Sequence, residues 1–478
     1  MVFASPIFLW AFLPAVLIVL WAAPKKVRNL LVSFSSLVFY AWGAHEFVLL
    51  LIACMALNFA AGQAIDSESL HANPRRRKAV LIATVAFNLS ILGVWKYGTF
   101  ALEQIADVRR AFGDDAGDVL QIALPIGISF FTFHHISYIV DVYRGVRGAQ
   151  KKPLEFITYI SMFPQLVAGP IVRYHEIADQ LPNDAPRNRW DDFTAGMPRF
   201  MLGLFKKVVI ADALAPIADA SFALESGDMT TTAAWLGAIA YTLQIYFDFS
   251  GYSDMAIGLG RMLGFRLPEN FARPYSAHSI TDFWRRWHMS LSNWFRDYVY
   301  VPLGGNRKGG GRTYVNLAIV FMLTGIWHGA NWTFIVWGAY HGAWLLIERR
   351  TGLRTLPRET WMWPRRALTF LIVVVGWVFF RASDLGNAFD MLGAMFWPTG
   401  GALPPEVGVA LGNQATFFLI AASLVVLIPG TFVLGRYVEF ATGRLADGVR
   451  VVTSVVAGPY AALIVAAGTF SPFLYFQF

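Results

Sequence analysis

Residues 324–334 read TGIWHGANWTF and place a histidine, His328, inside an apolar tract that runs from residue 315 to 347. Basic residues bracket this tract on both sides, and loops rich in lysine and arginine face the cytoplasm. One straight span cannot return both ends to the same side, so we expect the chain to break at Gly329 and Asn331, beside a protein-lined cavity. The alternative is one long tilted helix with its basic ends in opposite leaflets. The bracketing residues are Arg307, Lys308 and Arg312 before the tract and Arg349, Arg350 and Arg354 after it.

The composition is typical of a polytopic membrane protein. Of the 478 residues, 56% are hydrophobic and only 15% are charged, and the mean hydropathy is +0.49. An apolar helix needs roughly 20 residues to cross a membrane. The first apolar segment lacks a basic leader and a cleavage site, so we expect it to be retained. The predicted spans lie near residues 3–22, 29–43, 46–65, 79–98, 119–142, 195–217, 232–262, 315–347, 367–381, 411–434 and 451–470.

Basic residues gather in alternate loops, which predicts an outward N-terminus. The loop after the fourth predicted span, EQIADVRRAFGDDAGD, is mainly acidic, as expected for the opposite side. This distribution argues against nucleic acid as the reason for the net charge of +8. The single cysteine, Cys54, lies in an apolar run and allows no intramolecular disulfide. The basic loops contain Lys25, Lys26 and Arg28, then Arg75, Arg76, Arg77 and Lys78, and then Arg144, Arg147, Lys151 and Lys152.

No internal repeat or long polar linker divides the chain, so residues 1–478 are predicted to form one membrane domain. The polar segment 265–313 is expected on its cytoplasmic face. Within it, apolar residues recur at helical spacing from Phe283 to Tyr298, which predicts an amphipathic helix at the membrane interface. Its basic and aromatic residues either anchor the helix among lipid head groups or line a basic mouth for an anionic substrate. These residues are Trp284, Arg285, Arg286 and Arg296.

Two of the nine histidines stand apart, because His288 in RRWHMSLS and His328 in GIWHGANW each follow a tryptophan in a polar and aromatic island. The other histidines are expected to be loop residues or structural residues within spans. Asp248 and Asp254, in QIYFDFSGYSDMAIG, should be paired or solvated, and either orient a cationic side chain or lock helix packing. No zinc, phosphate-loop or nucleophile motif occurs. A histidine without a protein nucleophile suggests a general base that acts on a substrate hydroxyl.

Several longer motifs occur together along the chain. They read NLLVSFSSLVFYAW, QIYFDFSGYSDMAIGLGRMLGFRLPENF, DFWRRWHMSLSNWFRDYVYVPLGGNR, GIWHGANWTFIVWGAYHG, WVFFRA and the terminal FLYFQF. In combination they resemble the membrane-bound O-acyltransferase family, and specifically its bacterial alginate O-acetyltransferase branch. The resemblance implies an all-α polytopic membrane fold, with about ten to twelve transmembrane or re-entrant helices around a central tunnel.

The resemblance also implies roles for the two histidines. His328, in WHGA, matches the catalytic position, where Trp327 and Trp332 are expected to exclude water, and His288 matches a second functional position. Further residues are expected to bind the donor or to support these histidines. They are Arg285, Arg286, Trp287, Trp327, Asn331, Asp248 and Asp254.

The implied reaction passes an acetyl group across the bacterial inner membrane. The donor is a cytoplasmic thioester, either acetyl-coenzyme A or an acyl carrier, which is a substrate and not a cofactor. The recipient is a periplasmic SGNH-type acetyltransferase that modifies an exported polysaccharide such as alginate. Membrane lipid is an expected partner, whereas a metal and nucleic acid are not.

Two alternatives remain open from the sequence. One is a D-alanyl-type acyltransferase that uses a carrier protein. The other is a transporter or flippase for the polymer, with Asp248, Asp254 and the histidines as a polar path. Labelling or hydrolysis of acetyl-coenzyme A by the purified protein would separate an acetyltransferase from a transporter.

Overall fold

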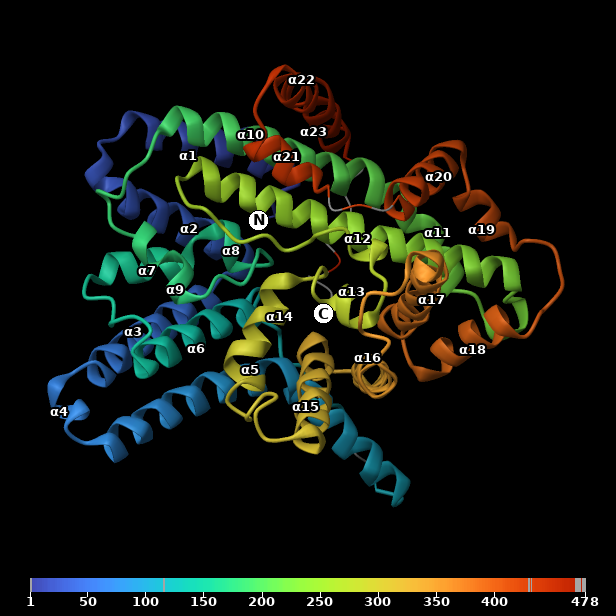
Figure 1. Ribbon diagram of the computed structural model, residues 1–478, viewed down its shortest axis with the longest axis horizontal. Helices are drawn as coiled ribbons and strands as arrows, with labels where there is room; N and C mark the ends of the chain where they lie inside the picture. Colours follow the sequence, from blue (N-terminus) through green and yellow to red (C-terminus); the bar gives the residue numbers. More distant parts are fainter. Residues whose placement is uncertain (1, 115–116, 429, 431, 469–473, 475–478) are drawn as a thin grey trace. The chain divides into compact units, whose positions relative to one another are not determined.

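The structure is a computed structural model that describes residues 2–114, 117–428, 430, 432–468 and 474. Every regular element in these residues is a helix, which confirms the predicted all-α fold (Figure 1). Of the terminal motif FLYFQF, only Leu474 lies within the described residues. The chain divides into two compact units, residues 1–197 with 256–268 and residues 198–255 with 269–478. The prediction of a single membrane domain stays a prediction.

The first unit packs its N-terminal helices around phenylalanine rings. The ring centroid of Phe8 lies 5.8 Å from that of Phe39 and 6.1 Å from that of Phe163. Aromatic side chains bury large apolar areas, so this cluster joins segments far apart in the sequence. The helices are α1 (Leu13–Ala22), α2 (Arg28–Ala44), α3 (Phe47–Ile65), α4 (Glu68–His71), α5 (Pro74–Ala111), α6 (Ile128–Arg144), α7 (Pro153–Ser161), α8 (Phe163–Leu166), α9 (Tyr174–Ile177) and the first part of α10 (Arg189–Phe205).

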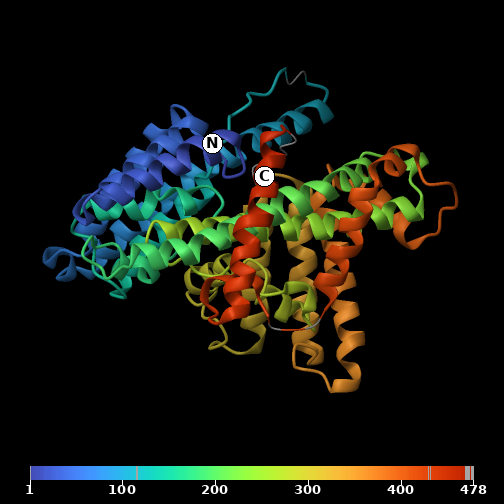
Figure 2. The same cartoon turned by 90° about the horizontal axis from the view of Figure 1, so that it is seen from above.

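The second unit contains residues 231–255 of the long helix α12 (Thr231–Met262), whose remaining residues belong to the first unit. The side chains from residue 240 to 255 are all buried except Tyr246. A helix that is apolar nearly all round belongs in a protein core. Figure 2 shows the same chain from above. The remaining helices are α11 (Asp212–Phe222), α13 (Ile280–Trp284), α14 (Met289–Phe295), α15 (Gly310–His328), α16 (Trp332–Thr351), α17 (Met362–Arg381), α18 (Leu385–Phe396), α19 (Pro405–Ala410), α20 (Asn413–Leu427), α21 (Leu434–Phe440), α22 (Arg444–Val452) and α23 (Gly458–Ala466).

Four helices in the described part of the chain are long and apolar enough to cross a membrane. Each of them overlaps a span predicted from the sequence. Two shorter apolar helices, Phe8–Ala22 and Asn413–Leu427, coincide with two further predicted spans. The total of ten to twelve membrane helices and the central tunnel stay predictions. The four helices are Phe47–Ile65, Pro74–Ala111, Glu359–Arg381 and Arg444–Ala466.

The span predicted at residues 119–142 is wrong in its first part. Helix α6 begins only at Ile128, and residues 117–125 are not helical. Gly127 has a φ of 75°, in the left-handed region, and a Cβ there would lie 2.7 Å from the carbonyl oxygen of Leu166. Only glycine fits such a turn. The chain therefore enters α6 through a tight turn that hydropathy does not reveal.

The tract 315–347 folds as a helical hairpin of α15 and α16. A Cβ on Gly325 would lie 2.4 Å from the carbonyl oxygen of Phe334 and 3.1 Å from the Cα of Gly338. The two helices approach this closely because both contact positions are glycine. The hairpin confirms the predicted break beside His328 and contradicts the single tilted helix. Its open end carries both sets of bracketing basic residues.

The amphipathic helix predicted from Phe283 to Tyr298 is wrong as one continuous element. Helix α13 ends at Trp284 and α14 begins at Met289, because His288 between them has φ 44° and ψ 54°. A left-handed residue cannot continue a right-handed helix. Trp284 is only 7% exposed, so it packs in the second unit and does not anchor a helix among lipid head groups.

Candidate active site

His328 is the last residue of α15 and is 3% exposed. Three aromatic rings lie against its imidazole, with centroids at 4.8 Å for Trp327, 4.9 Å for Trp337 and 5.1 Å for Phe380. These rings come from α15, α16 and α17. The hairpin and α17 together hold the histidine in a water-poor aromatic surrounding.

The turn after His328 allows this packing. A Cβ on Gly329 would lie 2.2 Å from the ring of Phe334, so a larger residue would push that ring away. Trp332 was expected to exclude water, but it is 51% exposed. The covering rings of Trp337 and Phe380 were not recognised in the sequence, because only the fold brings α16 and α17 to His328.

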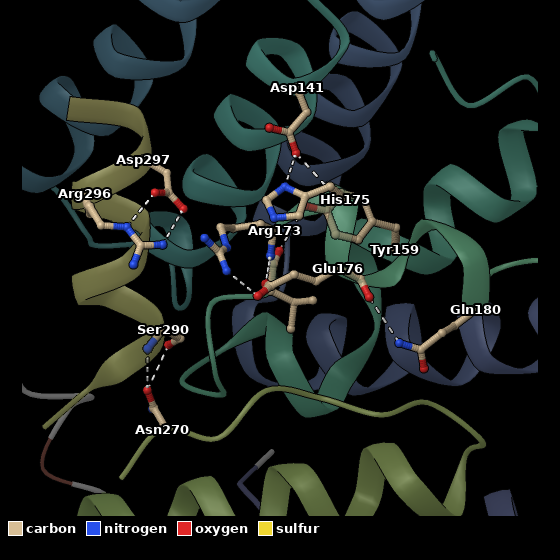
Figure 3. A network of polar contacts seen from close by, with 11 residues as sticks. Asp141, Tyr159, Arg173, His175, Glu176, Gln180, Asn270, Ser290, Arg296 and Asp297 are labelled. Atoms are coloured by element: carbon tan, nitrogen blue, oxygen red, sulfur yellow. Dashed lines mark hydrogen bonds and ion pairs between the residues drawn. The ribbon is translucent and has the colours of Figure 1, made fainter. Parts of the chain in front are cut away.

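His288 is 1% exposed and is oriented by Asn270. Its Nδ1 lies 3.0 Å from Asn270 Oδ1. The backbone N–H and the hydroxyl of Ser290 also donate to this oxygen, at 3.3 Å and 2.9 Å, which identifies it as the acceptor (Figure 3). His288 Nδ1 therefore carries the proton, and Nε2 of the neutral ring carries the lone pair.

A second contact connects this arrangement to α12. Asn270 Nδ2 donates to the hydroxyl of Ser253 at 3.0 Å, and the ring of Phe249 lies edge-on to His288 at 4.7 Å. Helix α12 thus supports the histidine through Ser253 and Phe249. Asn270, Ser253 and Phe249 were not predicted as site residues, although the last two lie within the motif QIYFDFSGYSDMAIG.

The ring of Trp327 lies close to both histidines. Its ring centroid is 6.3 Å from that of His288 and 4.8 Å from that of His328. These two distances limit the separation of the imidazoles to about 11 Å. The structure therefore brings together the two histidines that the sequence singled out.

His341 is a further buried histidine near this site, and it was expected to be a structural residue held by hydrogen bonds. Its ring lies 5.1 Å from that of Trp337, which also contacts His328. Neither of its ring nitrogens has a hydrogen-bond partner among the described residues. The aromatic surrounding of His328 therefore continues one turn further along α16.

Asp248 and Asp254 are paired, as expected for carboxylates in an apolar segment. Asp254 contacts Arg199 at 3.0 Å and Lys206 at 2.6 Å. Asp248 contacts Lys207 at 3.0 Å. None of these three ion pairs includes a histidine, but Asp254 does hold an arginine, so the contacts agree with both roles that the sequence left open.

The other predicted site residues have different surroundings and contacts. Arg286 contacts Asp282 at 2.9 Å, and Trp287 is buried between the rings of Phe271 and Trp377. Asn331 caps α16, where its side chain accepts a hydrogen bond from the N–H of Thr333.

Arg285 lines a cavity, which has a volume of about 270 Å³. We call it the arginine cavity. Its basic lining residues are Arg285, Arg296, Arg349 and Arg354.

The first unit holds a separate polar network. His175 Nδ1 lies 2.8 Å from Asp141 Oδ2, and the backbone N–H of His175 donates to the same oxygen (Figure 3). Arg173 and Glu176 close the start of α9 as a capping pair. His175 was expected to be a loop residue, whereas it belongs to a short helix and ties α9 to α6.

No three histidine, cysteine, aspartate or glutamate side chains converge on a possible metal position within the described residues.

Comparison with known proteins adds the family. Residues 131–382 match the model of the membrane-bound O-acyltransferase family. A probable alginate O-acetylase of Azotobacter vinelandii is 42% identical over all of both chains. A probable alginate O-acetylase of Pseudomonas aeruginosa is 48% identical over 83% of this chain and 75% of its own length. A peptidoglycan O-acetyltransferase of Helicobacter pylori is 34% identical over 88% of this chain and 83% of its own.

These relatives belong to the family that the two histidine motifs indicated. The matched ranges cover most of the chain and span the positions of His288 and His328. The chain belongs to the membrane-bound O-acyltransferase family, in its alginate O-acetylase-like branch, and is a membrane O-acyltransferase.

Proposed function

We propose that this protein moves acetyl groups from a cytoplasmic thioester, for which acetyl-coenzyme A is the candidate, across the inner membrane for O-acetylation of an exported polysaccharide such as alginate. The observation that carries the proposal is that two buried histidines, His288 and His328, both lie close to the ring of Trp327. The names of the relatives support acetyl as the group and a polysaccharide as the final recipient.

His328 is the general base in this proposal. Its imidazole takes the proton of an acceptor hydroxyl while the hydroxyl oxygen attacks the carbonyl carbon of the thioester. The carbon–sulfur bond breaks, and the thiol leaves with a proton, so one ester and one thiol result. The aromatic rings around His328 exclude water that would otherwise hydrolyse the thioester.

His288 acts on the donor side, because it lies next to the arginine cavity. Ser292 lines this cavity, and its backbone N–H donates to the carbonyl oxygen of His288 at 3.1 Å. Val320 also lines it. His328 follows Val320 by eight positions in α15, which corresponds to a rise of about 12 Å along the helix. An anionic donor held by the arginines therefore needs a flexible arm to bring its thioester to His328.

A different cavity lies near the turn of the hairpin and supports a protein as the first acceptor. Its volume is about 600 Å³, and Ser383, which lines it, accepts a hydrogen bond from Asn331 at 2.9 Å. A uronate polymer is a polyanion, so this acidic lining would repel it. A periplasmic SGNH-type partner that carries the acetyl group onward fits this charge better. The acidic lining residues are Asp219, Glu225, Asp384 and Asp390, and they outnumber the basic Arg381, which pairs with Asp219.

The decisive experiment replaces the proposed base. In cells that export the polymer, His328→Gln should leave the amount of protein in the membrane unchanged and lower polymer O-acetylation by about two to four orders of magnitude. His71→Gln is the matched control, because His71 is exposed and lies between α3 and α5. A His328→Gln protein that inserts normally and acetylates at a near wild-type rate would refute the proposed role.

A further inference from the structure

A small basic cavity lies in the first unit, at the end of α1. Its volume is about 50 Å³, and we call it the interfacial cavity. It combines charged and apolar walls, since apolar side chains of α1 and α12 complete it. Its basic lining residues are Lys25, Arg28, Arg187 and Arg189, and its apolar ones include Leu20, Met262 and Leu263.

Two of these arginines make cation–π contacts with the same aromatic ring. The guanidinium carbon of Arg28 lies 4.5 Å from the centroid of Phe265, and that of Arg187 lies 4.8 Å from the same centroid. The two positive charges are therefore no more than about 9 Å apart. Like charges at this distance repel one another, and a bound anion would relieve the repulsion.

Each of the two arginines has one buried nitrogen that lacks a partner. Arg28 Nη2 donates hydrogen bonds to the side-chain oxygen of Asn29 and to the carbonyl oxygen of Leu181. Arg187 Nη2 donates to the carbonyl oxygen of Gln180. The Nη1 atoms of both residues are buried without a hydrogen-bond partner among the described residues. A buried donor left unsatisfied costs about 1–3 kcal/mol, and more when it is charged.

The cavity also lacks a free counter-ion. The only acidic residue that lines it, Asp192, contacts Arg261 at 3.2 Å. Neither Arg28 nor Arg187 has a carboxylate within ion-pair distance in the part of the chain that the structure describes. Burial lowers the pKa of Arg187 to about 10, with Asp192 opposing the shift, so the guanidinium stays charged at neutral pH.

The size and position of the cavity indicate what kind of anion it takes. One water needs roughly 10–15 Å³, so a cavity of about 50 Å³ has room for a group larger than one water, such as a phosphate. Trp21 and Trp190, which are 41% and 62% exposed, lie 5.9 Å apart beside it. Exposed tryptophans next to basic residues are typical of the membrane–water interface.

We propose that the interfacial cavity binds the phosphate of an anionic phospholipid, with the acyl chains lying along the apolar surface of α1. The guanidinium groups of Arg28 and Arg187, which line the cavity, bind the phosphate oxygens, and Lys25 adds a long-range attraction from the rim. Leu20, Met262 and Leu263 provide the apolar wall that a soluble phosphate ion does not require. This binding does not depend on the proposed acetyl transfer.

The test uses the full-length protein in a neutral detergent. Phosphatidylglycerol, phosphatidylcholine and inorganic phosphate are each titrated, and binding is measured by native mass spectrometry and by the shift in Tm. Phosphatidylglycerol should bind at least tenfold more tightly than phosphatidylcholine and should raise Tm. Inorganic phosphate should neither raise Tm nor compete at equal concentration.

The variants identify the cavity as the place of binding. Arg187→Gln and Arg28→Gln should lose at least tenfold in affinity for phosphatidylglycerol, and Lys25→Gln, whose side chain is exposed, should lose a smaller factor. Lys26→Gln is the matched control, because Lys26 is adjacent and exposed but does not line the cavity.

If the arginine variants do not fold, Lys25→Gln still decides the matter against Lys26→Gln. Equal affinity of the Lys25 and Lys26 variants, equal binding of the two lipids, or binding of inorganic phosphate alone would overturn the proposal.

Discussion

The backbone at His288 decides what its side chain can do. With a φ of 44°, the residue turns the chain between α13 and α14. The turn lets the N–H of Met289 donate to the carbonyl oxygen of Asn270 while the imidazole reaches the side chain of the same residue. A left-handed residue other than glycine carries a cost in free energy, and such positions cluster at functional sites.

The buried imidazole of His288 predicts a pH dependence of stability. Burial lowers its pKa to about 3, whereas the unfolded chain binds the proton near the ordinary value of 6.5. Stability is therefore complete above pH 6.5 and is lost as the pH falls from 6.5 towards 3. We expect Tm in detergent to fall less steeply over this range for His288→Gln than for the wild type. Identical slopes would contradict a buried neutral ring.

At the scale of elements, the α15–α16 hairpin depends on its glycine contact. Gly325→Ala places a methyl group 2.4 Å from the carbonyl oxygen of Phe334, so the helices must separate. We expect the unfolding free energy to fall by about 1–3 kcal/mol, with a parallel loss of acetylation because His328 moves with the hairpin. Thermal unfolding in detergent and the acetyl content of the polymer measure the two effects.

A second glycine of α15 provides the control. A Cβ on Gly311 would meet no atom within 4 Å, and alanine favours a helix more than glycine does by about 1 kcal/mol. Gly311→Ala should therefore leave Tm unchanged or raise it slightly. Equal effects of the two substitutions would show that the contact at Gly325 does not hold the hairpin together.

The sequence could predict the hairpin but not the break at His288. In the hairpin, Gly329 and Asn331 interrupt an apolar tract, and the charges on both sides require a reversal. Around His288 the apolar period continues unbroken, and Phe283 and Trp287 are both buried although the helix between them ends. Periodicity records which side chains are buried and not whether one helix carries them.

The candidate site was predictable to the same degree. Both histidines were recognisable because each follows a tryptophan in a polar and aromatic island of the sequence, and His328 also lies in an apolar tract where a titratable ring needs a reason. Asn270, which orients one of them, lies in a polar loop where nothing in the local sequence distinguishes it. Trp337 and Phe380 belong to helical faces that read as ordinary core positions. Their roles depend on packing between segments far apart in the chain.

Across the whole second unit, buried charges connect distant segments. Arg199 contacts Asp254 at 3.0 Å and Glu269 at 2.7 Å, and it also contacts Glu439. Asp254 is 6% exposed and also forms an ion pair with Lys206. Its removal would leave two buried cations with fewer partners.

We therefore expect Asp254→Asn to lower the unfolding free energy by about 3 kcal/mol or more. Thermal unfolding in detergent would measure the change. Asp447→Asn is the matched control, because the Asp447 side chain is 67% exposed and pairs with Arg450 on the surface. An exposed pair contributes at most about 1 kcal/mol. If both variants lose the same stability, the buried network is not what holds these segments together.

Helix α5 is long enough for its two ends to report the orientation of the chain in the membrane. Its 38 residues rise by about 57 Å, whereas the hydrocarbon core of a membrane is about 30 Å thick. Arg76 near its start and Asp107 near its end are both exposed, so a spanning α5 places them on opposite sides. From the four basic residues at 75–78 we expect the start of α5 in the cytoplasm and the N-terminus outside.

Cysteine labelling tests this orientation directly. Cys54 is the single cysteine and is buried, so Cys54→Ala provides a background without thiols. In cells with a permeabilised outer membrane, an impermeant maleimide should label Asp107→Cys and spare Arg76→Cys until the inner membrane is disrupted. The two positions lie on one helix, which makes each the control for the other. Labelling of Arg76→Cys with protection of Asp107→Cys would invert the expected topology of α5 and with it the outward N-terminus.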